Sequence, residues 1–396
     1  FIDSSFASLS TAASEYLPPG AFTNLIAQGI IPGIGGILMF IPQITFLFLF
    51  ISILEESGYM SRVVFLMDKI MRRFGLSGKS VVPLISGTAC AIPAIMATRN
   101  IENWKERLIT ILVTPFTTCS ARLPVYAIII GLVIPDEYIL GFLNLQGLTL
   151  MLLYLLGFGM AILSAYSLNK VLQLNCKTFF VVEMPNYKLP MFKNVMITVV
   201  EKTKAFVFGA GKIILAISVI LWFLASNGPS EKFRNAATII SSKVENKTLS
   251  ALEIENKVAS FKLENSYIGI MGKTIEPAIS PLGYDWKIGV AIISSFAARE
   301  VFVGTLATIY SVGGSENETT IKNKMATETN PETGEKIFNF ASGISLLLYY
   351  AFALQCISTL AVTKKETNSW KWPLGQLIFM SSFAYIVALI AYQILK

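Results

Sequence analysis

Residues 78–124 have the apolar content of a membrane segment but are interrupted repeatedly by proline and glycine. In lipid, a helix break leaves backbone groups without hydrogen-bond partners, so breaks are tolerated only inside protein or beside a watery cavity. Transporters build solute sites near the middle of the bilayer from such discontinuous helices. This stretch therefore predicts a path for a solute. Its interrupting residues, and the two cysteines near them, are Pro83, Gly87, Pro93, Pro115, Pro124, Cys90 and Cys119.

Composition predicts an integral membrane protein. Apolar residues make up 54% of the sequence and charged residues 14%, whereas about 25% of residues are charged in soluble domains. Several apolar runs reach the length of about 20 residues that a spanning helix needs. The net charge of +7 is typical of Lys and Arg in cytoplasmic loops. Because no basic tract is interleaved with aromatic residues, we expect no nucleic-acid partner.

Polar connections separate the apolar runs. Residues 61–74 place apolar and charged side chains on opposite faces of a helix, which is typical of an interfacial amphipathic helix. Residues 226–275 are rich in Lys, Glu and Asn and predict an extramembrane cap, and residues 312–337 predict a polar loop. The apolar segments are 35–57, 81–98, 107–133, 145–172, 204–225, 286–311, 340–362 and 371–395.

The sequence contains an internal repeat. A shift of 208 positions without a gap aligns six identical pairs of residues, among them Gly75 with Gly283. Each half also consists of a span, a broken segment and two further spans. The span after each broken segment carries a cysteine, Cys119 in the first half and Cys356 in the second.

Charge predicts how the broken segments lie in the membrane. Basic residues flank segment 81–98 at both ends, which favours a re-entrant hairpin that enters and leaves on the cytoplasmic side. If segment 286–311 is also re-entrant, from the outside, every short loop obeys the positive-inside rule. Each half then has three true spans, an odd number, and the two halves form an inverted repeat. The alternative of eight full spans places one basic cluster outside.

We therefore expect an all-α integral membrane protein, a polytopic helical bundle with two inverted repeats. Each repeat contains a re-entrant broken segment and an interfacial helix. The chain begins with Phe1 and shows no signal-peptide pattern, so we expect the back part of a longer polypeptide. The expected divisions are an N-terminal extramembrane or interfacial segment 1–34, a first repeat 35–172, a cytoplasmic loop 173–203 and a second repeat 204–396.

Cys90, Cys119 and Cys356 are the candidate ligands of a transported ion. Histidine is absent, and thiolate is a soft ligand that suits transition metals better than Mg²⁺ or Ca²⁺. A transport site has to release its ion, so we expect two or three such ligands rather than a closed cage of four thiolates. The alternative is that these cysteines pack as small apolar side chains, which is the role we expect for Cys176 in its basic loop.

Acidic residues lie in or at the end of two apolar runs. Glu300 lies inside one, where an ionised group is costly and usually marks a pathway or an ion pair, so we expect a hard oxygen ligand or a gate. For its neighbour Arg299 we expect a gating or structural role, such as a pair with a carboxylate. Glu55 and Glu56 point about 100° apart on a helix, so only one can line a path, and Glu55 is the metal-ligand candidate.

Gating or structural roles are expected for several residues around the breaks. Arg122 lies between two prolines after Cys119, and we expect it to donate hydrogen bonds to carbonyls that the break frees. Met96 is a candidate thioether ligand, although methionine in a membrane helix usually packs. The prolines expected to shape the breaks are Pro93, Pro115 and Pro124.

Several stretches resemble the membrane domain of ferrous iron transport protein B. They include LEESGYMSR at 54–62, CAIPAIMATR at 90–99, PFTTCSARLPVYA at 115–127, VEMPNYKLP at 182–190 and PLGYDWKIGVAIISSFAAREVFVGTL at 281–306. A looser similarity extends to the gate halves of nucleoside carriers. The chain departs from the family where Ala89-Cys90-Ala91 replaces a frequent Gly-Cys-Asn, so an amide ligand is lost at that position.

The resemblance implies transport of ferrous iron, Fe²⁺, into the cell across a bacterial cytoplasmic (inner) membrane. Cys90, Cys119 and Cys356 would bind the ion transiently. GTP and Mg²⁺ would act only in an N-terminal GTPase domain absent from this chain, with residues 183–185 as its docking point, and this chain would not be an enzyme. Implied partners are the lipid bilayer, the small cytosolic ferrous iron transport protein A and further copies of the chain. The alternative function is a cation-coupled nucleoside carrier of the related gate-domain type.

Overall fold

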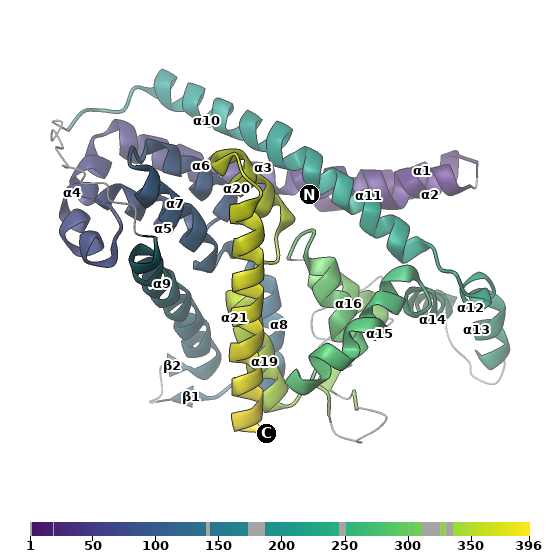
Figure 1. Cartoon of the computed structure of the whole chain (residues 1–396). Helices are drawn as coiled ribbons and strands as arrows, with labels where there is room; N and C mark the ends of the chain where they lie inside the picture. The colour runs from purple at the N-terminus through teal and green to yellow at the C-terminus, as the bar shows by residue number, and fades with distance from the viewer. Residues whose placement is uncertain are drawn as a thin grey trace. The chain divides into compact units, whose positions relative to one another are not determined.

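The computed structural model of the chain is built almost entirely of helices (Figure 1). It describes residues 2–18, 20–139, 143–172, 187–244, 251–299, 301–310, 325–326, 328–329 and 336–396. Six helical stretches in this part of the chain are long and apolar enough to cross a membrane, which confirms the predicted class of all-α polytopic membrane protein. They are Phe22–Glu56, Trp104–Val133, Leu145–Val171, Phe192–Ser226, Phe340–Thr367 and Lys371–Leu395.

The chain folds into two compact units. The first consists of Phe1–Ala121, Leu152–Ala216 and Ile357–Met380. Its helices are α1 (Ile2–Tyr16), α2 (Ala21–Asn24), α3 (Ile31–Glu56), α4 (Tyr59–Met71), α5 (Val81–Gly87), α6 (Ala91–Ala97), α7 (Trp104–Val113), α10 (Phe192–Phe206) and α20 (Ile357–Thr367).

The second unit consists of Arg122–Met151, Ile217–Cys356 and Ser381–Lys396. Its elements are α8 (Leu123–Val133), β1 (Tyr138–Ile139), β2 (Leu143–Asn144), α12 (Glu231–Arg234), α13 (Ala236–Val244), α14 (Ala251–Glu264), α15 (Tyr267–Ile279), α16 (Trp286–Ser295), α17 (Val301–Ile309) and α19 (Phe340–Phe352). Strands β1 and β2 pair antiparallel. Three helices continue from one unit into the other: α9 (Leu145–Val171), α11 (Lys212–Ser226) and α21 (Lys371–Leu395).

Two segments of the chain have the same order of elements at an offset of 208 residues. Helix α4 corresponds to α15 residue for residue, and each is followed by a 3₁₀ turn. Each turn ends in a glycine in the left-handed region, Gly75 with φ of 78° and Gly283 with φ of 80°. A side chain would be strained in this conformation, which explains the shared glycine. The two segments fold alike, while the predicted inversion of one relative to the other stays a prediction.

An acidic side chain holds the start of the next helix in both segments. Asp68 Oδ1 of α4 accepts a hydrogen bond from Gly78 N at 2.8 Å. Glu276 Oε1 of α15 accepts one from Trp286 N at 3.2 Å. N–H groups at a helix start have no partner within the helix, and negative charge is favoured there. This interaction fixes each amphipathic helix to the helical segment that follows it.

The predicted broken segments are pairs of short helices. In the first unit, α5 and α6 are separated by residues 88–90, and in the second, α16 and α17 are separated by residues 296–300. Neither pair is among the six stretches long enough to span a membrane. Six is the number that the re-entrant interpretation requires, whereas eight full spans require two more. That the pairs enter and leave on one side of the membrane stays a prediction.

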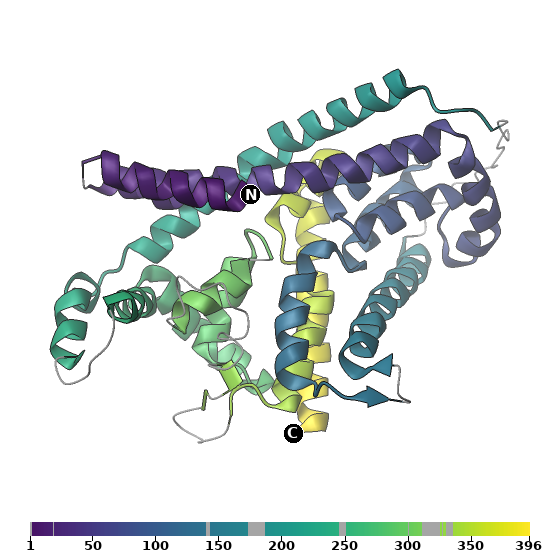
Figure 2. The same cartoon turned by 180° about the vertical axis from the view of Figure 1, so that it is seen from behind.

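Two further helices are broken where the chain passes between the units. The span α7–α8 breaks between Val113 and Leu123, and the span α19–α20 breaks between Phe352 and Ile357. In each span, the chain changes unit within the break. As a result, α20 packs on α6 in the first unit, and α8 packs on α17 and α19 in the second (Figure 2).

The long helices of the first unit start earlier than the sequence predicts. Helix α1 packs along α3 (Figure 2), and the apolar helical stretch that contains α3 begins at Phe22, within the predicted segment 1–34. Helix α10 packs along α3 (Figure 1) and begins at Phe192, within the predicted loop 173–203. It buries Val195, Val199 and Phe206, whose spacing gives one apolar helical face.

The predicted cap 226–275 is helical where the structure describes it, as α12, α13, α14 and the start of α15. Helix α14 packs on α17, and Ser260 Oγ donates to Ile309 O at 2.6 Å. Most of the predicted loop 312–337 lies outside the described residues. A described residue of this loop, Glu328, forms an ion pair with Lys287.

Replacing Asp68 with alanine should destabilise the protein by about 1–3 kcal/mol, because the buried Gly78 N–H loses its acceptor. Asp68→Asn, which keeps an acceptor oxygen, should cost less. Thermal unfolding in detergent measures both. The control is Glu102→Ala, which removes the exposed partner of Lys79 and should change the unfolding midpoint little. An unchanged midpoint for Asp68→Ala would contradict the anchoring role.

Candidate functional site

Two helix breaks in the first unit carry Cys90 and Cys119. Cys90 directly precedes α6 and has extended backbone, with φ of −156° and ψ of 133°. Cys119 lies in the break between α7 and α8, after a 3₁₀ turn at Thr114–Phe116. Both side chains are partly buried, and neither forms a disulfide within the described residues. Each cysteine therefore lies on backbone that has left helical geometry.

Hydrogen bonds join the two breaks directly. Ser120 donates to Ala89 O from its backbone N at 3.4 Å and from its Oγ at 2.9 Å. Gln43 Nε2 of α3 donates to Ser120 Oγ at 2.5 Å. Ala89 and Ser120 are the direct neighbours of Cys90 and Cys119 in sequence. The second break thus binds a carbonyl freed by the first, and the two thiols belong to one junction.

Close packing of the hairpin on the broken span depends on Gly87. A Cβ atom at this position would lie 2.4 Å from Thr117 Oγ1 and 3.2 Å from Thr114 Cγ2. Thr117 Oγ1 itself donates to Thr114 O at 2.7 Å, which fixes its position in the break. Any larger residue would push α5 away from the break, so glycine keeps the junction closed.

The three predicted prolines each lie near the start of a helical piece. Pro115 lies in the 3₁₀ turn at the start of the break, Pro124 lies in the first turn of α8, and Pro93 is the third residue of α6. N–H groups in a first turn have no acceptor within the helix, so proline is tolerated there. The prolines therefore define where each helical piece begins.

Gln376 of α21 binds two carbonyls near the end of α7, one of which Pro115 leaves free. Proline has no N–H, so Ile111 O loses its partner within the helix. Gln376 is buried, and its Nε2 donates to Ile111 O at 3.3 Å and to Leu112 O at 2.9 Å. The sequence predicts that Arg122 donates to carbonyls freed by the break, and this role stays a prediction. Arg122 is fully buried, but the described donor to these two carbonyls is Gln376, a polar residue within an apolar run.

The second unit contains a corresponding link between breaks. Arg299 lies between α16 and α17 and is buried, and its Nη2 donates to Ala353 O, in the break after α19, at 3.2 Å. Within the described part of the chain, Arg299 thus binds a carbonyl that the break frees, and its pairing with a carboxylate stays a prediction. Cys356 is partly buried in the same break as Ala353.

Several predicted residues have other surroundings or lie outside the described part of the chain. Glu300, Cys176 and residues 183–185 are outside it, so their roles stay predictions. Met96 is buried in an apolar cluster that includes Ile92, and Cys90 packs against this cluster. These surroundings are those of a packing residue for Met96.

Glu55 and Glu56 face different surroundings, as helix geometry predicts. Glu56 Oε1 accepts a hydrogen bond from Asn194 Nδ2 at 3.0 Å. Glu55 lines a cavity of about 320 Å³ in the first unit that reaches Ser86 and Pro93 on the two arms of the hairpin. The polar residues of its lining are Ser52, Glu55, Ser61, Lys79, Ser86, Asn100, Thr198 and Lys202.

The cysteines do not form a preformed metal cage in the described residues, where no group of three or more Cys, Asp and Glu side chains is gathered. Cys90 and Cys119 belong to the first unit and Cys356 to the second. The convergence of the three cysteines on one path therefore stays a prediction.

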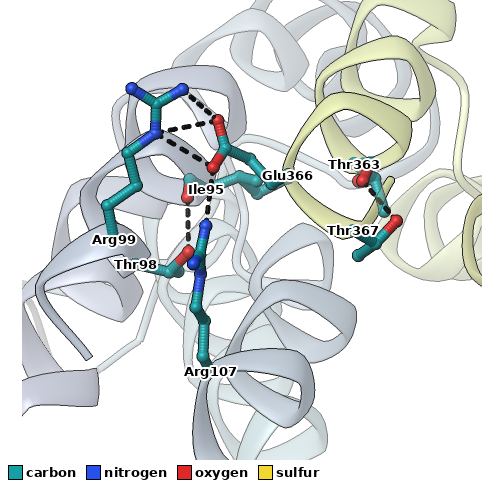
Figure 3. A network of polar contacts seen from close by, with 7 residues as sticks. All are labelled: Ile95, Thr98, Arg99, Arg107, Thr363, Glu366 and Thr367. Carbon is teal, nitrogen blue, oxygen red and sulfur yellow. Dashed lines mark hydrogen bonds and ion pairs between the residues drawn. The ribbon is translucent and has the colours of Figure 1, made fainter. Parts of the chain in front are cut away.

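An ion cluster that the sequence analysis missed joins α7, α20 and the 3₁₀ turn Thr98–Asn100 directly after α6, all in the first unit (Figure 3). The Glu366 side chain is only 3% exposed and pairs with Arg99 Nη2 at 2.5 Å and Arg107 Nη2 at 2.8 Å. Its hydrogen bond raises the pKa of Arg99 above the usual value. The available signal is a glutamate shortly after the predicted span 340–362, with two arginines after the predicted hairpin 81–98.

Replacing Gln376 with leucine should destabilise the protein by about 1–3 kcal/mol, because two buried carbonyls lose their donor. Thermal unfolding in detergent measures this, and faster cysteine labelling by a maleimide reports a loosened break. The matched control is Gln393→Leu, which removes an exposed hydrogen bond to Pro281 O from the same helix. Equal effects of the two substitutions would contradict the role of Gln376.

Two family models match the chain. The model described as "Gate: Nucleoside recognition" matches residues 37–133 and 207–370. The model described as "Ferrous iron transport protein B C terminus" matches residues 150–202. No solved structure matches the chain significantly.

Curated relatives named Fe(2+) transporter FeoB match nearly all of the chain. The protein from Leptospira interrogans (serovar Lai) is 46% identical over 394 residues, which are 100% of this chain and 54% of the relative. The protein from Staphylococcus aureus (strain MSSA476) is 37% identical over 372 residues, which are 94% of this chain and 49% of the relative. An Fe(2+) transport protein A/Fe(2+) transporter FeoB fusion protein from Porphyromonas gingivalis is 36% identical over 398 residues. These are 98% of this chain and 46% of the relative.

The chain therefore spans about half the length of the curated relatives that it matches. The Gate model covers more than half of the chain, and the second model falls between its two matched parts. The chain belongs to the ferrous iron transport protein B family, in the part that contains the Gate domain.

Proposed function

We propose that this chain forms the membrane path by which ferrous iron enters the cell. The observation that carries the proposal is the junction of two helix breaks, in which the neighbours of Cys90 and Cys119 are hydrogen-bonded to each other. Soft sulfur ligands suit a transition metal ion, and discontinuous helices are where transporters place their sites. The names of the relatives support Fe²⁺ as the substrate.

In this proposal, Fe²⁺ passes the junction with Cys90 and Cys119 as transient ligands. Thiols bind a metal ion as thiolates, so ion binding releases protons and ion release takes them up. Few ligands let the ion leave, whereas a cage of four thiolates would hold it as a structural site does. Cys356, in the corresponding break of the second unit, is the third proposed ligand, and Glu300 beside Arg299 is a proposed oxygen ligand.

The cavity beside the hairpin gives the ion an aqueous compartment. Hydroxyl, amide and carboxylate oxygens of its lining can replace water around a hard cation. Lys79 and Lys202 also line this cavity, and Lys79 pairs with Glu102 at 2.9 Å. Glu55 is therefore the negative charge that attracts the cation there.

The proposal includes the rest of the full-length protein. We place the path in a bacterial cytoplasmic membrane, with GTP and Mg²⁺ acting in an N-terminal GTPase domain outside this chain, so that this chain catalyses no reaction. The fused relative supports association with ferrous iron transport protein A. Further copies of the chain are proposed as partners.

Combined replacement of Cys90, Cys119 and Cys356 with serine should lower Fe²⁺ uptake on the order of tenfold or more, as loss of metal-site residues does. Uptake by the full-length protein in cells or liposomes measures this. The matched control is Cys176→Ser, which should leave uptake unchanged. Tracer uridine uptake tests the alternative of a nucleoside carrier. Unchanged Fe²⁺ uptake after the triple replacement would contradict the proposal that these thiolates bind the ion on its path.

Glu55→Gln and Glu56→Gln form a second matched pair. Glu55→Gln removes the negative charge from the cavity and should lower the rate of Fe²⁺ uptake. Glu56→Gln keeps an acceptor oxygen for Asn194 and should leave uptake near wild type. The same Fe²⁺ uptake measurement applies, and equal effects of the two substitutions would contradict the assignment of Glu55 to the path.

A further inference from the structure

The ion cluster of Glu366, Arg99 and Arg107 carries excess positive charge. Two arginines pair with one carboxylate, and the cation Lys365 lines the same small cavity as Arg99 and Glu366. Removing one partner from a buried ion pair is strongly destabilising. A purely structural ion pair would need only one arginine for one carboxylate. The additional cations therefore indicate a further role for the cluster.

The buried face of α20 leads to this cluster. Thr359, Thr363 and Glu366 are buried and lie four and three residues apart, which places them on one side of the helix. Ser358 Oγ and Thr363 Oγ1 have no hydrogen-bond partner among the residues that the structure describes. Buried hydroxyl groups of this kind normally bind water or an ion. The face begins at Thr359, three residues after Cys356 in sequence, and ends at Glu366.

Helix α20 lies against α6, which is the second arm of the hairpin. Helix α20 packs on α6, and Val362 joins the apolar cluster that contains Ile92 and Met96. A cavity of about 50 Å³ is lined by these apolar side chains and by Arg99, Lys365 and Glu366. A cavity of this size holds water where polar groups line it.

We propose that the cluster of Arg99, Arg107 and Glu366 is the closed inner gate of the ion path. This inference rests on the proposed function of Fe²⁺ transport. Cationic side chains in a narrow, low-dielectric passage are a barrier to cations. The barrier opens when Arg99 leaves Glu366, because the carboxylate then faces the passage with less positive charge beside it. Arg99 is the moving part, since its side chain is 50% exposed whereas that of Arg107 is 22% exposed.

The test is the basal leak of Fe²⁺ through the protein in liposomes without nucleotide. Arg99→Gln should raise the leak about tenfold, which corresponds to a barrier lowered by about 1.4 kcal/mol. Arg99→Lys keeps the charge and should keep the leak low. The matched control is Lys273→Gln, which removes an exposed ion pair with Glu264 at 2.9 Å and should leave the leak unchanged. Thermal unfolding of each variant is measured in parallel.

The outcomes separate the gate from a purely structural cluster and from the proposed function. If Arg99→Gln lowers the unfolding midpoint but leaves the leak at the wild-type value, the cluster has only a structural role and the gate is wrong. If Arg99→Gln and Arg99→Lys raise the leak equally, charge is not the barrier and the gate is also wrong. If neither wild type nor any variant passes Fe²⁺, with or without nucleotide, the proposed function fails and the gate with it.

Discussion

A broken helix inside a membrane has to satisfy the carbonyls that the break frees from within the protein. In this chain three different donors do so: Ser120 for Ala89 O, Gln376 for Ile111 O and Leu112 O, and Arg299 for Ala353 O. Each donor comes from a different segment of the chain than its acceptor. The breaks are therefore held by long-range hydrogen bonds, and the packing at Gly87 follows from that closeness.

This constraint also connects the fold to the proposed transport. Backbone that has left the helix can bend around an ion, and the donors that satisfy it keep the neighbouring thiols in place. Cys90 and Cys119 thereby lie at a built junction without a closed cage. At the other end of α6, Glu366 and two arginines hold the same helix against α20. Binding at the junction and closure at the cluster can act on one helix pair.

The sequence predicts those features of the fold that local chemistry determines. Prolines at 93, 115 and 124 locate the starts of helical pieces, and the alignment of Gly75 with Gly283 marks two turns with the same left-handed conformation. The different surroundings of Glu55 and Glu56 follow from helix geometry alone. The membrane class follows from composition.

The remaining features depend on partners far apart in the sequence. Glu366 and Arg99 are separated by 267 positions, and Gln376 and Ile111 by 265. No periodicity or spacing within one segment specifies such a pair. The sequence does not predict the start of α10 at Phe192 for a related reason. The charged residues of this segment are typical of a loop, and its apolar face is recognised only from its packing on α3. For the same reason, the cysteines could be proposed as ligands but not shown to converge.

The central claim is that Fe²⁺ binds at the junction of the two breaks. Anomalous scattering at the iron edge from crystals of the Fe²⁺-loaded protein tests it most directly. We predict a peak within about 2.5 Å of the sulfur atoms of Cys90 and Cys119, a bonding distance for metal and thiolate, and no peak there in Cys90→Ser crystals. Iron found only at exposed carboxylates, with both sulfur atoms unoccupied, would contradict the account.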